Sequence, residues 1–191
     1  MKHINMNTDM VKAILEGRKT QTRRPMKLVD GWIPRLINVK NWKYIGVVEN
    51  EGITLPLKSK YSIGDKVFVK ETWATGFFLK NMLYKADATS EAIEKGTGRI
   101  CVFSNSVKWK PATHMKEEQS RITLEITDVR VERLQEISEE DCKAEGAELL
   151  PYCRYRHDFV ILWNSIYDKK GYGWDKNCWC WVYTFKVIEG V

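Results

Sequence analysis

Residues 120–131 read SRITLEITDVRV, which is the longest candidate strand in the chain. Ile122, Leu124 and Ile126 alternate with polar residues, and Val129 follows nearly in step. Alternation with a period of two is typical of a strand that buries one face and exposes the other. A strand of this kind needs partner strands beside it, and the flanking sequence supplies candidates.

Two further segments alternate in the same way, namely KVFVKETW at 66–73 and WCWVYTFKVI at 179–188. Helical patterns are short and lie at 8–16, 138–146 and 157–168. Several strands beside a few short helices favour an α+β fold over a doubly wound parallel sheet. We expect a curled, mostly antiparallel sheet or a small β-barrel, flanked by short helices.

Length and composition favour one globular domain. The chain has 191 residues, of which 43% are hydrophobic and 29% are charged, an ordinary composition for a folded protein. Mixed segments at about 26–60 and 76–106 interrupt the pattern and are interpreted as insertions. No apolar run approaches the roughly 18–20 residues of a membrane helix, and the first residues lack a secretory signal. We therefore expect a cytoplasmic protein with no membrane partner.

The cysteine pattern argues against metal and cofactor sites. Five Cys are spaced irregularly without a C-x-x-C pair, and the three His lie far apart in sequence. These spacings do not match a closed zinc site, so we expect no metal and no cofactor. Free thiols are the simplest interpretation. Cys178 and Cys180 flank Trp179, so on a strand their side chains would share one face.

Charge is distributed unevenly along the chain. The net charge is +6, but residues 1–27 carry seven Lys and Arg against two acidic residues. Residues 128–148 carry three basic residues against eight acidic ones. A basic segment like the first is typical of proteins that bind polyanions, although a solvated basic edge has the same composition.

Five segments, taken in order, carry a family resemblance. They are LEGRKTQTRR at 15–24, IGDKV at 63–67, WKPATHM at 109–115, the strand-to-helix pattern at 129–146 and the aromatic helix pattern at 159–167. Their order and spacing resemble the ASCH domain, a branch of the PUA-like superfamily, and in particular the larger ASCH-like proteins of phages and prophages. The resemblance implies a small β-barrel with a cleft beside the first helix, and binding of RNA or nucleotides.

One branch of ASCH domains, the small acetylcytidine amidohydrolases, has a functional Lys and Thr in a Gly-Arg-Lys-Thr-x-Thr segment. Its functional Glu lies near the end of the helix after the long strand. The matching positions here are Lys19, Thr22 and Glu145, so the resemblance implies a catalytic site at these residues. The present chain is much longer than those enzymes and has Arg23 where they have an apolar residue.

These three side chains suit hydrolysis of an N-acyl bond. Thr22 supplies a hydroxyl, Lys19 can accept its proton if burial and nearby cations lower a pKa of about 10.4, and Glu145 can protonate the leaving nitrogen. An offset of three residues puts Lys19 and Thr22 on opposite faces of a regular strand, so they converge only in a bulged segment. We expect the three residues to line one pocket. There Lys19 would pair with Glu145, which raises the pKa of Lys19.

A nucleic-acid interface needs fewer precisely placed side chains than a catalytic site does. Cations neutralise phosphates, and aromatic side chains stack on unpaired bases. Near the end of its strand, Glu71 is placed to read a base amino group, and His114 to fix its loop by a hydrogen bond. The candidate binding residues are Arg18, Arg23, Arg24, Glu71, Trp73, Trp109 and His114.

The sequence leaves three functions open. The first is a protein that binds a nucleotide or single-stranded RNA in a basic cleft. The second is an amidohydrolase acting on an N-acylated cytidine or a related nucleoside. The third is a phage assembly or interaction module without a ligand, with the 76–106 insertion as its surface. A cavity shared by Lys19, Thr22 and Glu145 would favour the enzyme, and an open basic groove would favour binding.

Overall fold

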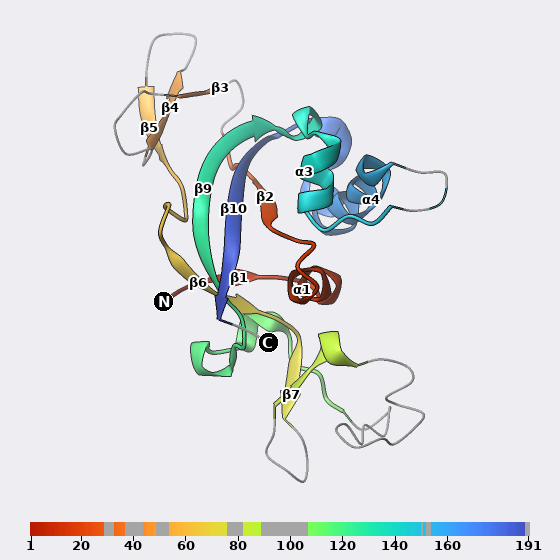
Figure 1. Ribbon diagram of the computed structural model, residues 1–191. Coiled ribbons are helices and arrows are strands. Elements are labelled where there is room, and N and C mark those ends of the chain that lie inside the picture. The colour runs from red at the N-terminus through yellow and green to blue at the C-terminus, as the bar shows by residue number, and fades with distance from the viewer. Residues whose placement is uncertain are drawn as a thin grey trace. The chain divides into compact units, whose positions relative to one another are not determined.

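The fold is a mixed α+β structure (Figure 1). The computed structural model describes residues 1–28, 33–36, 44–48, 54–75, 82–88, 107–149, 151 and 154–189. The α-helices are α1 (Thr8–Leu15), α3 (Glu139–Ala144) and α4 (Tyr155–Tyr167). The strands are β1 (Lys2–Asn5), β2 (Gln21–Pro25), β3 (Ile33–Leu36), β4 (Tyr44–Val48), β5 (Thr54–Lys58), β6 (Lys66–Lys70), β7 (Trp73–Thr75), β8 (Met82–Tyr84), β9 (Thr123–Arg133) and β10 (Trp179–Glu189). None of the helices in these ranges is long and apolar enough to cross a membrane.

The described strands form three sheets. The largest has the strand order β1-β6-β9-β10-β2, and it contains all three strands expected from the alternating segments. Its two edges are β1 and β2, so this sheet is not closed into a barrel. At one edge β10 pairs with β2 in antiparallel register, with Val182 opposite Arg23. At the other edge β1 runs parallel to β6, while the other pairings whose register is given are antiparallel, as expected for most of the sheet.

The segment 66–73, expected to be one strand, is divided in the structure. Strand β6 ends at Lys70, and Trp73 begins β7, which pairs with β8 in a separate sheet. The backbone of Trp73 also exchanges hydrogen bonds with Lys110, at 3.2 and 2.7 Å. Alternation identified the strand-forming residues correctly, but the partner strand changes within the segment, and periodicity carries no information about partners.

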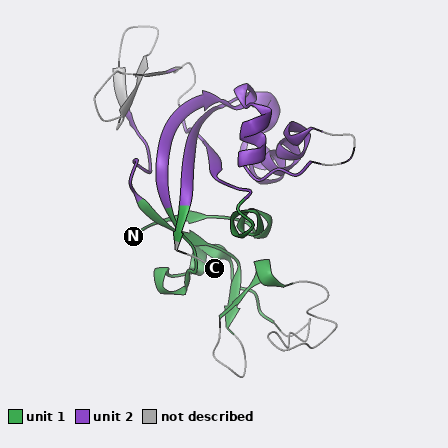
Figure 2. Cartoon of the chain, viewed as in Figure 1, with its two compact units in different colours: residues 1–17, 66–124, 187–191 green, residues 18–65, 125–186 purple. Residues whose placement is uncertain are grey.

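Contacts divide the chain into two units that are interleaved in sequence (Figure 2). Unit 1 comprises residues 1–17, 66–124 and 187–191, and unit 2 comprises residues 18–65 and 125–186. Strands β9 and β10 contribute residues to both units. The segment interpreted as a first insertion, 26–60, contains the three-stranded sheet β3-β4-β5. Of the second, 76–106, only residues 82–88 are described.

Helix α1 belongs to unit 1 and begins and ends as its sequence predicts. The Asn7 side chain accepts a hydrogen bond from the Met10 N–H at 2.8 Å, which is an N-cap. Gly17 has a φ of 73°, a left-handed conformation that ends the helix at low cost. The apolar face of the helix is buried through Val11 and Ile14.

Unit 2 holds a core built around α3 and α4, which lie side by side in Figure 1. On α4 the aromatic residues Phe159, Trp163 and Tyr167 recur every four residues and are buried. They pack with Leu134, Ile137, Cys142, Ala147 and Cys180. This packing fixes α3 beside β2 and β10, which is where the candidate site lies.

The six-residue helix α3 depends on its N-cap. The Ser138 Oγ accepts the Asp141 N–H at 3.0 Å, so Ser138→Ala should lower the free energy of unfolding by about 1 kcal/mol. Ser165→Ala is the matched control, because that exposed hydroxyl only donates to the Leu162 carbonyl within α4, and its effect should stay below about 0.5 kcal/mol. Urea unfolding followed by circular dichroism measures both. Equal losses in the two variants would contradict the capping role.

Candidate functional site

The end of α3 brings the segment 18–20 into contact with the helix. Gly146 has a φ of 90°, its N–H bonds to the Lys143 carbonyl and the Ala147 N–H bonds to the Cys142 carbonyl, which is a Schellman motif. Three carbonyls beyond these still need donors. The Thr20 N–H donates to Ala144 O at 2.8 Å, Lys19 Nζ to Glu145 O at 2.6 Å and Arg18 to Gly146 O at 2.9 Å. Three consecutive residues therefore satisfy three consecutive carbonyls.

Lys19 also forms the expected ion pair with Glu145. Lys19 Nζ lies 2.8 Å from Glu145 Oε2, and the two side chains are 0% and 4% exposed. The pair is therefore enclosed by protein and shielded from the solvent that weakens surface ion pairs. This geometry confirms that Lys19 and Glu145 are partners.

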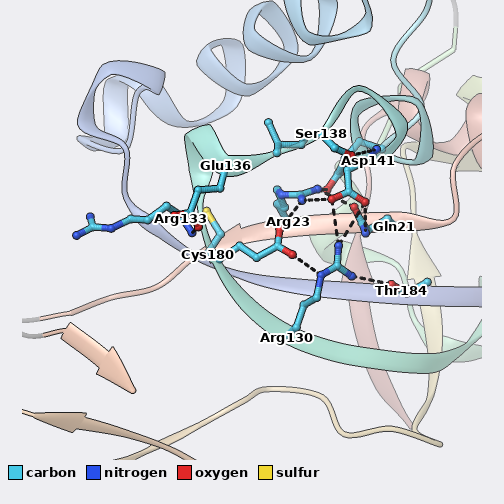
Figure 3. Close-up of polar contacts among 12 residues, drawn as sticks. Gln21, Arg23, Arg130, Arg133, Glu136, Ser138, Asp141, Cys180 and Thr184 are labelled. Carbon is cyan, nitrogen blue, oxygen red and sulfur yellow. Dashed lines mark hydrogen bonds and ion pairs between the residues drawn. The ribbon is translucent and has the colours of Figure 1, made fainter. Parts of the chain in front are cut away.

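The Arg23 guanidinium is buried beside that pair and faces three carboxylates. It lies 2.7 Å from Glu132, 2.8 Å from Asp141 and 3.4 Å from Glu145, and it donates to Gln21 Oε1 at 2.6 Å. Figure 3 shows the Arg23 and Asp141 side chains pointing toward one another. The remaining donor, Arg23 Nε–H, is buried and has no acceptor in the described part of the chain, where the indole N–H groups of Trp73 and Trp179 are in the same position.

Arg130 completes the arrangement on its more exposed side. It pairs with Glu132 and, at 3.2 Å, with Asp141, and it donates to Thr184 Oγ1 at 3.3 Å (Figure 3). We call the six charged residues the β2–α3 charge network. Its members are Lys19, Arg23, Arg130, Glu132, Asp141 and Glu145. The three cations and three carboxylates of the network balance when all are ionised, and Arg130 also pairs at 3.3 Å with Asp128, a half-exposed carboxylate at the edge of the network.

Burial changes the electrostatic balance at Lys19. Loss of solvent lowers the pKa of Lys19, and the positive charges of Arg24 and Arg23 lower it further. Glu145 acts in the opposite direction but does not outweigh burial. The rise expected from pairing is therefore present, but desolvation exceeds the attraction of a single carboxylate and leaves the pKa of Lys19 lowered.

Thr22 lies on the other face of β2 from this network. Residues 19, 21 and 23 face α3, and Thr22 falls between them in a regular strand opposite Tyr183. Tyr183 stacks edge-on against Tyr61 at 4.9 Å. Thr22 is buried, and no hydrogen bond joins it to Lys19 or Glu145 among the described contacts. The structure thus brings Lys19 to Glu145 without bringing Thr22 to either.

The basic residues predicted to bind phosphate have protein partners in unit 2. Arg18 lies 3.2 Å from Glu148, and Arg23 is enclosed by the charge network. Arg24 donates to the Tyr167 hydroxyl at 3.0 Å. These side chains hold unit 2 together, and a phosphate at Arg23 would have to displace carboxylates.

The other predicted binding residues, Glu71, Trp73, Trp109 and His114, belong to unit 1. Glu71 is buried and bound by Arg121 through two contacts of 2.9 and 3.2 Å. Burial raises the pKa of Glu71, although Arg121 opposes this. Trp73 is buried under the Lys110 ammonium, 4.5 Å from the ring centre. Trp109 is half-buried and His114 is exposed.

Several residues of these sites were not among the sequence candidates, namely Gln21, Arg121, Arg130, Glu132 and Asp141. The charge distribution points to two of them, Glu132 and Asp141. The basic segment 1–27 supplies Lys19 and Arg23, and the acidic segment 128–148 supplies the three carboxylates that face them, together with Arg130. In the described residues, no group of three or more His, Cys, Asp or Glu side chains is arranged to hold a metal ion.

The chain can be compared with protein families, curated proteins and solved structures. No protein-family model matches it, and no curated protein matches it. Among solved structures it is similar to protein EF3133 from Enterococcus faecalis V583, which is described by the family model DUF984. The two share 11% sequence identity with a TM-score of 0.44, over 99% of this chain and 81% of that one.

Removing the carboxylate of Glu145 tests the electrostatics of Lys19. Glu145→Gln should destabilise the protein by about 3–5 kcal/mol at neutral pH, because it leaves a buried ammonium without its charged partner. In the variant the folded-state pKa of Lys19 falls further below 10.5 than it does in the wild type. Between these two folded-state pKa values the folded variant binds fewer protons than the folded wild type, so its stability rises more steeply with pH and the loss shrinks.

Urea unfolding of the wild type and Glu145→Gln at several pH values between about 6 and 9.5 measures this difference. Glu148→Gln is the matched control, because Glu148 is 65% exposed and its partner Arg18 also stays partly in solvent. That control should change stability by less than about 1 kcal/mol at every pH. A loss in Glu145→Gln that does not depend on pH would show that Lys19 keeps its proton regardless of its partner.

Proposed function

We propose that this chain is an ASCH-like, PUA-like protein of the phage and prophage type, and that unit 2 binds a nucleoside or nucleotide beside the β2–α3 charge network. The observation that supports this is Arg23 Nε–H, a buried donor of a charged side chain without an acceptor in the described residues. Buried donors are nearly always paired, and one left unpaired costs about 1–3 kcal/mol. A ligand carbonyl oxygen, such as that of a pyrimidine ring, has the chemistry to pair with it, and binding must first open access to the Arg23 side chain, which is 0% exposed.

The balance of charge favours a neutral base over a polyanion at this position. Lys19, Arg23 and Arg130 are matched by Glu132, Asp141 and Glu145, so a phosphate placed here would meet three carboxylates. A nucleobase offers donors and acceptors without charge and does not disturb this balance. Of the two ligands expected from the sequence, the nucleoside or nucleotide therefore fits the network better than the backbone of single-stranded RNA.

Binding can be measured by isothermal titration calorimetry with cytidine, N4-acetylcytidine, cytidine monophosphate and a single-stranded oligoribonucleotide. We expect the two nucleosides to bind with little dependence on salt, because no phosphate is neutralised. Arg23→Lys keeps the charge but removes Nε–H, so it should weaken binding at least about tenfold, the effect of losing a hydrogen bond to a charged group. Arg18→Lys is the control, since Arg18 donates to the Gly146 carbonyl at the end of α3 and pairs with the exposed Glu148.

Two outcomes would contradict this proposal. If only the oligoribonucleotide binds, with a salt slope near −0.7 per phosphate contact, the ligand is a polyanion. If none of the four compounds binds, unit 2 has no site of this kind. Arg23→Lys is checked for folding by its urea midpoint before its affinity is compared.

The second candidate is an amidohydrolase acting on an N-acylated cytidine or a related nucleoside. Burial lowers the pKa of Lys19, as a general base requires, and the Glu145 carboxylate lies 2.8 Å away to hold the conjugate ammonium. Because Thr22 faces away from Lys19, water is the better nucleophile. Once substrate and water reach this enclosed pair, the deprotonated form of the Lys19 amine takes a proton from water as the oxygen adds to the acyl carbon. The C–N bond then breaks and Lys19 returns that proton to the leaving nitrogen.

Hydrolysis of N4-acetylcytidine to cytidine and acetate, followed by chromatography, tests this mechanism. We expect turnover by the wild type, loss of at least about 100-fold in Lys19→Met, which removes the amine at similar volume, and unchanged turnover in Ser165→Ala. Thr22→Val distinguishes the nucleophiles, since retained turnover indicates water and lost turnover indicates the Thr22 hydroxyl. Absence of turnover in a wild type that binds nucleosides would leave binding as the function.

A further inference from the structure

Two thiols meet where β10 begins in unit 2. Cys178 Sγ and Cys180 Sγ lie 3.9 Å apart on either side of Trp179. Residues i and i+2 of an extended segment share one face, so this closeness follows from their spacing in the chain. The two sulfurs are not bonded in the structure. A disulfide needs an S–S distance of about 2.05 Å, and rotation of the two side chains can bring the sulfurs that close.

The two thiols differ in their access to solvent. Cys178 is half-buried, whereas Cys180 is 0% exposed within the core of unit 2. A reagent can therefore reach Cys178, while Cys180 can be reached only by a group already attached to its neighbour. The third described thiol, Cys142, is also 0% exposed, and burial raises its pKa to about 12. Among the described cysteines, only Cys178 combines access with a second thiol beside it.

The surroundings of Cys178 favour its thiolate. The hydrogen bond with Cys180 lowers the pKa of Cys178, burial opposes it, and the charge of Arg133 lowers it further. Arg133 is held in place because its guanidinium lies over the Trp179 ring at 4.4 Å and donates to the Asn177 carbonyl at 3.0 Å. A thiolate next to a fixed cation is the form that attacks disulfides.

The backbone around the pair is fixed on both sides. The Leu134 N–H donates to the Cys178 carbonyl at 3.0 Å, and the Met26 N–H donates to the Trp179 carbonyl at 2.8 Å. Asn177, just before the pair, adopts a left-handed φ of 42°. Closing a disulfide across one intervening residue therefore relies on side-chain rotation, and the small ring it makes is strained. Strained disulfides are readily reduced, which suits reversible oxidation.

We propose that Cys178 and Cys180 form a redox-active dithiol that small-molecule disulfides oxidise to an intramolecular disulfide. The Cys178 thiolate attacks one sulfur of the reagent, forms a mixed disulfide and expels one thiolate. Cys180 then attacks Cys178 Sγ, which breaks the mixed disulfide, and its proton goes to the second thiolate that leaves. The protein loses two electrons and two protons, and the reagent becomes two thiols. The dithiol proposal does not rest on the nucleoside site proposed above, although Cys180 lies near Arg23 (Figure 3).

The reagent 5,5′-dithiobis(2-nitrobenzoate) tests the proposal on the native full-length chain. Trypsin cleavage after Lys176 and Lys186 releases residues 177–186, which contain Cys178 and Cys180 and no other cysteine. After native oxidation, with remaining thiols blocked on denaturation, mass spectrometry should find this peptide lighter by two hydrogen atoms and without a thionitrobenzoate adduct. Dithiothreitol should restore its original mass.

Variants separate the two roles. Cys180→Ser should leave a stable thionitrobenzoate adduct on Cys178, because the resolving thiol is gone, and Cys178→Ser should leave the native peptide unmodified, because Cys180 is buried. The wild-type peptide decides the question even if a variant fails to fold. A persistent adduct in the wild type, or a peptide that reacts only after denaturation, would show two ordinary core thiols and overturn the proposal.

Discussion

The carbonyl end of α3 constrains unit 2 more than any other feature. A helix of six residues leaves more carbonyls unpaired than it satisfies, and these must find donors when the end is buried. Arg18, Lys19 and Thr20 provide those donors, and this brings β2 beside the helix. Once residue 19 faces α3, strand alternation turns residues 21 and 23 toward it as well. Arg23 is then buried by its position in the chain, and the carboxylates around it compensate that burial.

The pairing at the end of α3 shows which polar groups of unit 2 already have protein partners and which group is left for a ligand. Lys19 and Glu145 satisfy each other, and cations at helix C-termini are favourable, so a structural role accounts for both without a bound molecule. A buried ion pair adds little to stability, because desolvation of the two charges offsets their attraction. Arg23 Nε–H is different, since nothing in the described fold explains a buried donor without an acceptor. The nucleoside proposal rests on that group for this reason.

Sequence patterns predicted the α+β class and the strands β6, β9 and β10, because each depends on local alternation. The parallel pairing of β1 with β6 was not predictable in the same way, since a four-residue strand has no distinctive period and its partner lies some 60 residues away. The Lys19–Glu145 pair could be predicted from a helix dipole and one cation. The direction in which the pKa of Lys19 is shifted could not be predicted. Burial decides that direction, and burial is a property of the folded chain.

The sequence also does not show which charges of the basic segment 1–27 are paired inside the folded protein. Its charge suggests a surface for a polyanion, yet Arg18, Lys19 and Arg23 are paired with carboxylates from the acidic segment 128–148. Internal pairing leaves the total charge of +6 unchanged but moves the excess to other side chains, mainly exposed lysines. Attraction of RNA to such lysines would be diffuse and sensitive to salt, whereas recognition beside a neutral buried network depends on hydrogen bonds and shape. RNA and a nucleoside would therefore bind to different parts of the protein, and the salt dependence of the affinity distinguishes the two.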